Sequence, residues 1–180
     1  PMTGLEPTRF EPAKTMTRKI QDFLSLNGES LEVMTYPLVG KKLLEKAGWE
    51  NQNEELKLVN ALSKDADRMR PSMVPNALEV VAENSKRFNR FSFFEVGRSY
   101  LPSEKDFANE RHQVLIACFD KTKTPFVELI NKTEKLLNFL NIPFDLASET
   151  GKFKNEVLSQ EWEGSHPHEF SHIRIMGKFK

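Results

Sequence analysis

Three of the four histidines lie within the short segment HPHEFSH, where they could perform metal chemistry. In an extended strand His166, His168 and His172 would share one face, and Glu169 could activate a zinc-bound water. The spacing does not match the helical His-Glu-x-x-His arrangement, and Pro167 disfavours a helix at this point. One possible function is therefore a metal-dependent hydrolase. The simpler interpretation is that the histidines bind no metal.

The run KRFNRFSFF mixes cations with aromatic rings, a combination found in proteins that bind single-stranded nucleic acid. Lys86, Arg87 and Arg90 could contact phosphates while the phenylalanines stack on bases. The alternative is a solvated helix end, because basic residues complement the dipole at a helix C-terminus. The chain has 26 basic and 26 acidic residues, so no net charge favours RNA binding. An independent RNA-binding domain is therefore a second, weaker alternative.

The other reactive groups form no catalytic arrangement. Cys118 lies in the apolar run VLIACF, where a cysteine is expected to be a small buried hydrophobe. Glu104 and Asp106 lie in a charged segment and are expected to be solvated. The eight glycines form neither a Gly-x-Gly-x-x-Gly motif nor a Gly-Lys-Ser/Thr loop. Because a single cysteine cannot form an intramolecular disulfide, we expect a reducing, cytoplasmic location.

The elements that must position these residues include several helices. Apolar residues at helical spacing predict helices over 15–26, 41–47 and 126–140. The first is expected to end at a left-handed Asn27-Gly28 stop. Pro71 and Pro75 cannot both lie inside a helix, so a further helix is expected to start between residues 72 and 76.

Apolar runs predict the strands between these helices. We expect strands over 31–38, 56–60, 91–100, 113–119 and 172–176, with a charged loop over 103–112. Helices and strands alternate irregularly, and the connections are polar and several residues long. The order predicts an α+β fold in which a mainly antiparallel sheet is flanked by helices.

The chain of 180 residues is long enough for one domain with a small appendage. Its apolar runs are all far shorter than a membrane span, so we expect no membrane partner. The proline-spaced opening PMTGLEPTRFEP is typical of a boundary segment, which we assign to residues 1–14. Residues 15–180 are then the folded module, and its last strand suggests that the module is truncated at its C-terminal end.

The most distinctive stretch is LVNALSKDADRMRPSMVPNALEVVAENSKRFNRFSFFEVGRSYL, which resembles the β subunit of bacterial-type phenylalanyl-tRNA synthetase in its synthetase-like core module. The family's pattern there is roughly Asn-Pro-Leu-Ser, then Met-Arg-x-Ser-Leu-x-Pro-x-Leu-Leu, then Phe-Glu-x-Gly-Arg-x-Tyr/Phe. The chain matches this pattern at Asn60, Leu62, Ser63, Met69, Arg70, Ser72, Pro75, Leu78, Phe94, Glu95, Gly97, Arg98 and Tyr100. Ala61 departs from it, because it replaces the proline of the first motif.

The resemblance implies a class II aminoacyl-tRNA synthetase fold that has lost its catalysis. In the family's catalytic α subunit the same strand continues as Gly-Arg-Val-Tyr-Arg-Arg-Asp, and the arginine after tyrosine holds the ATP α-phosphate. Leu101 has that position here, and Ser103 has the acidic one. Removing one such electrostatic stabiliser typically costs on the order of 10²–10³ in rate. The fragment is thus expected to hold no cofactor, whereas the whole enzyme uses ATP and magnesium.

The resemblance also implies partners, since two α and two β chains assemble in this family. The helix over 15–26 corresponds to the class II dimer helix. Its apolar residues Ile20, Phe23 and Leu24 could serve a subunit interface or the domain's own core, and Arg18 and Gln21 on the other face would then be better interface candidates. The implied function is a non-catalytic module that supports assembly with the α subunit, and hence ATP-dependent charging of tRNA(Phe).

Overall fold

The computed structural model describes residues 12–50, 52–105 and 108–142, together with the backbone of 170–176. Their order along the chain is α1 (Pro12–Leu26), β1 (Leu31–Glu32), β2 (Leu38–Val39), α2 (Lys41–Lys46), η1 (Glu54–Leu56), η2 (Lys64–Ala66), β3 (Arg68–Met69), α3 (Val74–Asn84), β4 (Arg90–Leu101), β5 (Asn109–Asp120), α4 (Phe126–Phe139) and β6 (Phe170–Met176). Here η denotes a 3₁₀-helix.

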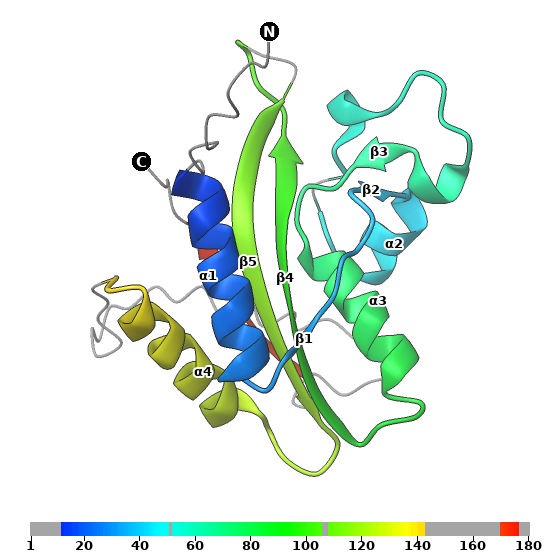
Figure 1. Ribbon diagram of the computed structural model, residues 1–180. Helices are drawn as coiled ribbons and strands as arrows, with labels where there is room; N and C mark the ends of the chain where they lie inside the picture. The colour runs from blue at the N-terminus through cyan, green and yellow to red at the C-terminus, as the bar shows by residue number, and fades with distance from the viewer. Residues whose placement is uncertain (1–11, 51, 106–107, 143–169, 177–180) are drawn as a thin grey trace, which may run out of the picture.

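The main sheet has the strand order β1-β4-β5-β6. The pairs β4–β5 and β5–β6 are antiparallel, and only the short edge pair β1–β4 is parallel. Helices α1 and α4 lie on one side of this sheet and α3 lies on the other (Figure 1). The predicted α+β fold, with a mainly antiparallel sheet flanked by helices, is confirmed.

Alternate residues of β4 and β5 point to opposite faces of the sheet and build two cores. On the α3 side, Phe93 and Leu115 pack against Val81. On the other side, Phe94 packs against residues of α1 and α4, which include Ile20, Leu24, Leu129 and Leu136. This arrangement explains why residues 113–119 are almost continuously apolar, because this part of β5 is buried on both faces.

The strand predicted over 31–38 is only partly formed. Leu31 and Glu32 pair with β4, and the Val33 N–H donates to the Phe94 carbonyl at 2.9 Å. The chain then leaves the main sheet, and β2 pairs with β3 in a separate two-stranded sheet. Pro37 lies between the two pieces and cannot donate to a ladder.

The strand predicted over 56–60 is wrong. A 3₁₀-helix ends at Leu56, and Lys57 makes one isolated bridge to Arg68. Beyond it Val59 is almost fully exposed, because the loop protrudes from the small lobe formed by α2, β2 and β3 (Figure 1). Alternating apolar residues cannot form a strand here, since the neighbouring strand β3 is only two residues long.

Several element boundaries also differ from those expected. Helix α1 begins at Pro12, within the segment assigned to the boundary. Strand β5 begins at Asn109, so the charged loop predicted over 103–112 is shorter, because the hairpin with β4 continues as far as Leu101. No helix in the described ranges is long and apolar enough to cross a membrane.

The left-handed residue after α1 is Glu29, with φ 48°, rather than the expected Gly28. Gly28 is needed for a different reason. A Cβ at Gly28 would lie 2.7 Å from the Leu24 carbonyl oxygen, so the chain can pass the end of the helix only without a side chain.

Candidate functional site

The last half of β4 carries the residues on which the resemblance depends. Glu95, Gly97, Ser99 and Leu101 alternate along the strand and therefore lie on one face, the face that α3 covers. Glu95 and Ser99 are buried, whereas Leu101 is half-buried. This face at the end of β4 is the candidate site.

Arg70 crosses this face and is held on every side. Its Nη2 lies 2.9 Å from Glu95 Oε1, and its Nε donates to the Arg98 carbonyl at 2.7 Å. Its Nη1 donates to Thr35 Oγ1 at 2.6 Å, and the Thr35 hydroxyl in turn donates to Glu95 Oε2 at 2.6 Å. The side chains of Arg70 and Glu95 are only 3% and 5% exposed. The network is therefore closed, and it joins the β1–β2 segment to β3 and β4.

Two arginines at this end of the sheet have partners from the chain itself, whereas Arg111, which is exposed and pairs in register with Ser99, forms no ion pair within the described ranges. Arg70 is held in the closed network, and Arg98 forms an ion pair with Glu110. Leu101 offers only carbon, and the Ser103 hydroxyl accepts a hydrogen bond from the Lys105 N–H at 3.3 Å. Leu101 and Ser103 do not fit ATP or magnesium, since they supply neither a guanidinium for a phosphate nor a carboxylate for the ion.

Gly97 lies under the guanidinium of Arg70. A Cβ at this position would lie 2.6 Å from Arg70 Nη2, 2.7 Å from Met73 Sδ and 2.9 Å from Glu95 Oε1. Those atoms end long side chains, but the buried network holds them in place. The glycine of the Phe-Glu-x-Gly motif is therefore explained by close packing.

Gly97→Ala is expected to lower the free energy of unfolding by about 1–3 kcal/mol, because the added methyl group overpacks a closed site. Urea unfolding measures the effect. Ser99→Ala is a suitable control, because it keeps a small residue on the same strand face. An unchanged midpoint for Gly97→Ala would contradict the close packing.

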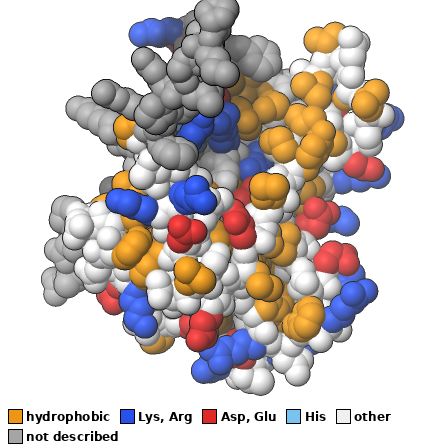
Figure 2. All heavy atoms as spheres, in the orientation of Figure 1, with side chains coloured by type: hydrophobic (Ala, Val, Ile, Leu, Met, Phe, Trp, Pro, Cys, Tyr) orange, Lys and Arg blue, Asp and Glu red, His pale blue; other side chains and the backbone are white. Residues whose placement is uncertain are grey.

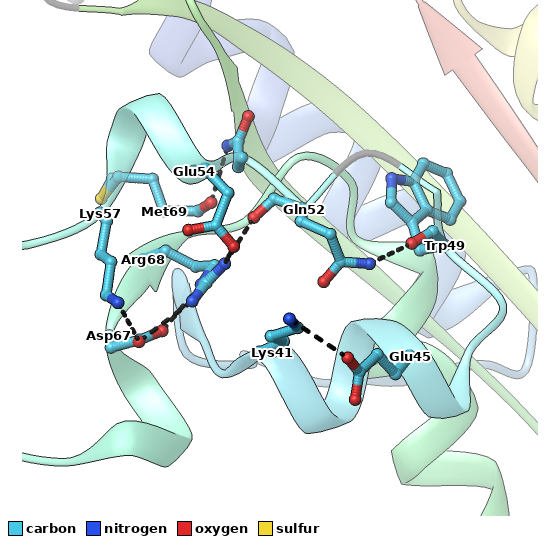
Figure 3. A network of polar contacts seen from close by, with 10 residues as sticks. Lys41, Glu45, Trp49, Gln52, Glu54, Lys57, Asp67, Arg68 and Met69 are labelled. Carbon is cyan, nitrogen blue, oxygen red and sulfur yellow. Dashed lines mark hydrogen bonds and ion pairs between the residues drawn. The ribbon is translucent and has the colours of Figure 1, made fainter.

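A second polar network binds the small lobe together and is centred on Arg68, which is 2% exposed (Figure 3). Its Nε donates to Asp67 Oδ1 at 2.8 Å, and its Nη1 donates to the Gln52 carbonyl at 3.0 Å. Its Nη1 also contacts Glu54 Oε1, and Lys57 Nζ lies 3.7 Å from Asp67 Oδ2. The network joins β3 to η1, so its role is structural.

The hydrogen bond from Arg68 holds the pKa of Asp67 below the ordinary value of 3.8. A carboxylate with a lowered folded-state pKa stabilises the fold above its unfolded pKa, and this contribution is lost as the pH falls through the folded pKa.

We therefore expect the free energy of unfolding to fall between roughly pH 5 and pH 2, and to fall less steeply in Asp67→Asn. Urea unfolding across this range measures both slopes. Asp65→Asn serves as the control, because Asp65 is exposed in the adjacent 3₁₀-helix. Equal slopes for the wild type and Asp67→Asn would contradict the role of the Arg68 pair.

The lone cysteine is unsuited to nucleophilic chemistry. Cys118 is buried in the core beside α1 and α4, and burial raises the pKa of its thiol to about 12. The thiol is protonated at neutral pH, so it packs as a small hydrophobe, as the sequence predicts.

The histidine cluster lies largely outside the described residues. The backbone of β6 pairs His172 with Ala117, whereas His166 and His168 fall in a range that the structure does not describe. Among the described residues no group of three or more His, Cys, Asp or Glu side chains could hold a metal ion. The metal prediction for these histidines stays a prediction.

The residues predicted for a subunit interface differ in exposure. Ile20 and Leu24 are buried in the chain's own core, and Phe23 stacks on Phe139 with the ring centroids 4.7 Å apart. Arg18 is exposed, and Gln21 donates to Glu32 Oε1 at 2.5 Å. Gln21 thus lies beside β1, and Arg18 is one turn earlier on α1.

Sequence reasoning missed an apolar strip next to α1. Met34 and Tyr36 are 89% and 65% exposed and form this strip, whereas Val33 and Thr35 point inward. Leu31 is 71% exposed but lies on the same strand face as Val33 and Thr35, so it is not part of the strip. Figure 2 shows hydrophobic side chains spaced along this segment on the face in view. The alternation of the segment could have indicated one buried face and one exposed face, but the prediction over 31–38 was of a strand without assigned faces.

The fold and the site together define the class II aminoacyl-tRNA synthetase fold. Pyrrolysyl-tRNA synthetase from Desulfitobacterium hafniense matches the structure with a TM-score of 0.56, over 73% of this chain and 48% of that chain. The two are 18% identical, so this likeness concerns the fold alone.

The model of the family described as "Phenylalanyl tRNA synthetase beta chain CLM domain" matches residues 1–179, and the chain belongs to this family. The phenylalanine–tRNA ligase beta subunit of Leptospira biflexa is 26% identical over 144 residues, which are 73% of this chain and 18% of the relative. The beta subunit of Halalkalibacterium halodurans is 25% identical over 169 residues, which are 89% and 20%. The chain thus spans about a fifth of the length of these curated relatives.

Proposed function

We propose that the chain is a non-catalytic structural module of a phenylalanine–tRNA ligase β subunit. It supports assembly with the catalytic α subunit in an α2β2 complex, and hence the ATP-dependent charging of tRNA(Phe). Family membership supports a place in a ligase complex. The complex works in the cytoplasm, where ATP and magnesium are held by the α subunit.

The end of β4 carries the proposal that the module has no catalysis of its own. Leu101 stands where the resemblance implies a phosphate-binding arginine, and Ser103 stands where it implies an acidic residue. The guanidinium of Arg70, which crosses the same strand face, is bound by Glu95 and is not available to a phosphate. A role in assembly would explain why the module has a synthetase fold although it catalyses no reaction.

The exposed strip of Met34 and Tyr36 supports the assembly role. Large apolar residues that share one exposed face are typical of a surface that a partner covers. The hydrogen bond between Gln21 and Glu32 joins the strip to the outer side of α1. Arg18 and Gln21, the interface candidates from the sequence, would form its polar margin.

Capture by the α subunit tests this function. The 180-residue chain, immobilised through a tag, is expected to retain purified α subunit from the same organism and to elute with it as one species in size-exclusion chromatography. A class II synthetase catalytic subunit for a different amino acid serves as the control and should pass through. Failure to retain the α subunit, with the chain shown to be folded by circular dichroism, would contradict the proposal.

A further inference from the structure

Two basic turns lie side by side at one end of the main sheet. Arg90 at the start of β4 pairs in register with Asp120 at the end of β5, and the Lys121 N–H donates to the Asn89 carbonyl at 2.9 Å. Figure 2 shows basic side chains at this lower end of the molecule. The cations of the two turns and of the adjacent α4 are Lys86, Arg87, Arg90, Lys121, Lys123, Lys132 and Lys135.

The carboxylates at this end offset only part of that charge. Glu128 is shared, since it lies 2.7 Å from Arg90 Nη2 and 3.7 Å from Lys132 Nζ. The other carboxylates at this end are those of Glu29, Glu83, Asp120 and Glu134. Seven cations against five carboxylates leave an excess of two positive charges, although the chain as a whole is neutral. Within the described ranges, no ion pair engages Arg87, Lys121, Lys123 or Lys135.

An open groove of about 610 Å³ runs between the end of α1 and the first turns of α4. Lys132 is nearly buried in its wall and donates to the Gly28 carbonyl oxygen, which fixes its position. Lys123 and Lys135 line the groove and form no ion pair within the described ranges, and Arg90 lines it beside Glu128. The groove therefore presents several cations to whatever enters it.

We infer that this groove and its two basic turns bind the phosphate backbone of RNA. Protein–protein interfaces are depleted of lysine and glutamate in their core, so a groove lined by three lysines and two glutamates is unlike one. A phosphate backbone instead matches cations spread over two turns and a helix, and this contact would be independent of base sequence. The inference rests on the proposed function, in which the ligase handles tRNA.

The aromatic half of the run KRFNRFSFF does not take part in the way that the sequence suggests. Phe91 and Phe93 pack into the core, and Phe91 stacks on Phe119 with the ring centroids 5.0 Å apart. Base stacking on Phe91 and Phe93 is therefore excluded, whereas Phe88 of the same run is 53% exposed. The contact inferred here is the electrostatic one. Lys86 forms an ion pair with Glu83 at 2.9 Å, which leaves Arg87 as the more available cation before β4.

Binding of fluorescein-labelled tRNA(Phe) transcript to the 180-residue chain, measured by anisotropy from 50 to 200 mM salt, tests the inference. The variant Lys123→Glu/Lys135→Glu is expected to bind at least about tenfold more weakly. With single-stranded poly(U) the slope of log affinity against log salt should become shallower by about 1.4, at about 0.7 per lost phosphate contact. The matched control is Lys42→Glu/Lys46→Glu, because both lysines are exposed on α2 and the charge change is the same.

The inference is supported if the groove variant binds the RNA more weakly while the affinity of the control variant changes less than twofold. Absence of wild-type binding at 50 mM salt, equal weakening by both variants, or equally tight binding of polyglutamate would each overturn it. Polyglutamate stands in for an acidic protein, which is the other kind of polyanion that a basic groove could bind. Capture of the α subunit should be intact in the groove variant, so failure here is distinguishable from failure of the proposed function.

Discussion

Arg70→Met is expected to lower the free energy of unfolding by about 3–5 kcal/mol, because it leaves the Glu95 carboxylate buried without its cationic partner. The guanidinium also bonds Thr35 and the Arg98 carbonyl, so three segments lose their common contact. Urea unfolding of the variant measures the loss.

Arg98→Met provides the matched control for this prediction. The Arg98–Glu110 pair is exposed, at 53% and 40% of the side chains, and exposed pairs contribute about 0–1 kcal/mol. The double variant Arg70→Met/Glu95→Gln should regain part of the loss, because no charge then stays buried. If Arg70→Met costs no more than Arg98→Met, the closed network does not stabilise the fold as inferred.

Met34→Glu/Tyr36→Glu is expected to weaken binding of the α subunit by about 100-fold or more. Residues central to an interface typically contribute at least about 2 kcal/mol each, and every 1.4 kcal/mol is about tenfold in affinity. The inward Thr35 between them is held by Glu95, which keeps the strip in place. The measurement is the dissociation constant by surface plasmon resonance.

Val59→Glu/Leu62→Glu is the control for the strip, because Val59 and Leu62 are 96% and 105% exposed in the protruding loop of the small lobe. The change in charge and in exposed apolar area is similar, but the residues lie on another part of the surface. We expect less than a threefold effect. Equal weakening by the two double variants would show that the strip is not a specific contact.

The main helices and the two long strands could be predicted from local patterns. Pro71 and Pro75 placed the start of α3 between residues 72 and 76, and it begins at Val74. Helix α4 runs over Phe126–Phe139, within one residue of the prediction. In each of these elements the spacing of the apolar residues matches the face that is buried. Their positions can therefore be predicted from short stretches of sequence.

The site could not be predicted in the same way, because its contacts join distant parts of the chain. Arg70 meets Thr35 and Glu95 only after β3 and β4 are in place. The only signal in the sequence was the resemblance, which marked Arg70, Glu95 and Gly97 without saying that they touch. The basic groove depends likewise on the pairing of Arg90 with Asp120, which no periodicity encodes.

ATP–pyrophosphate exchange by the purified 180-residue chain is the measurement that tests the central claim most directly. With magnesium and saturating ATP, we expect no exchange above the protein-free background, whether phenylalanine is present or not. The complex with the α subunit supplies the positive reference for the same assay. Exchange that rises in proportion to the concentration of the chain alone would contradict the claim that Leu101 has replaced the catalytic charge.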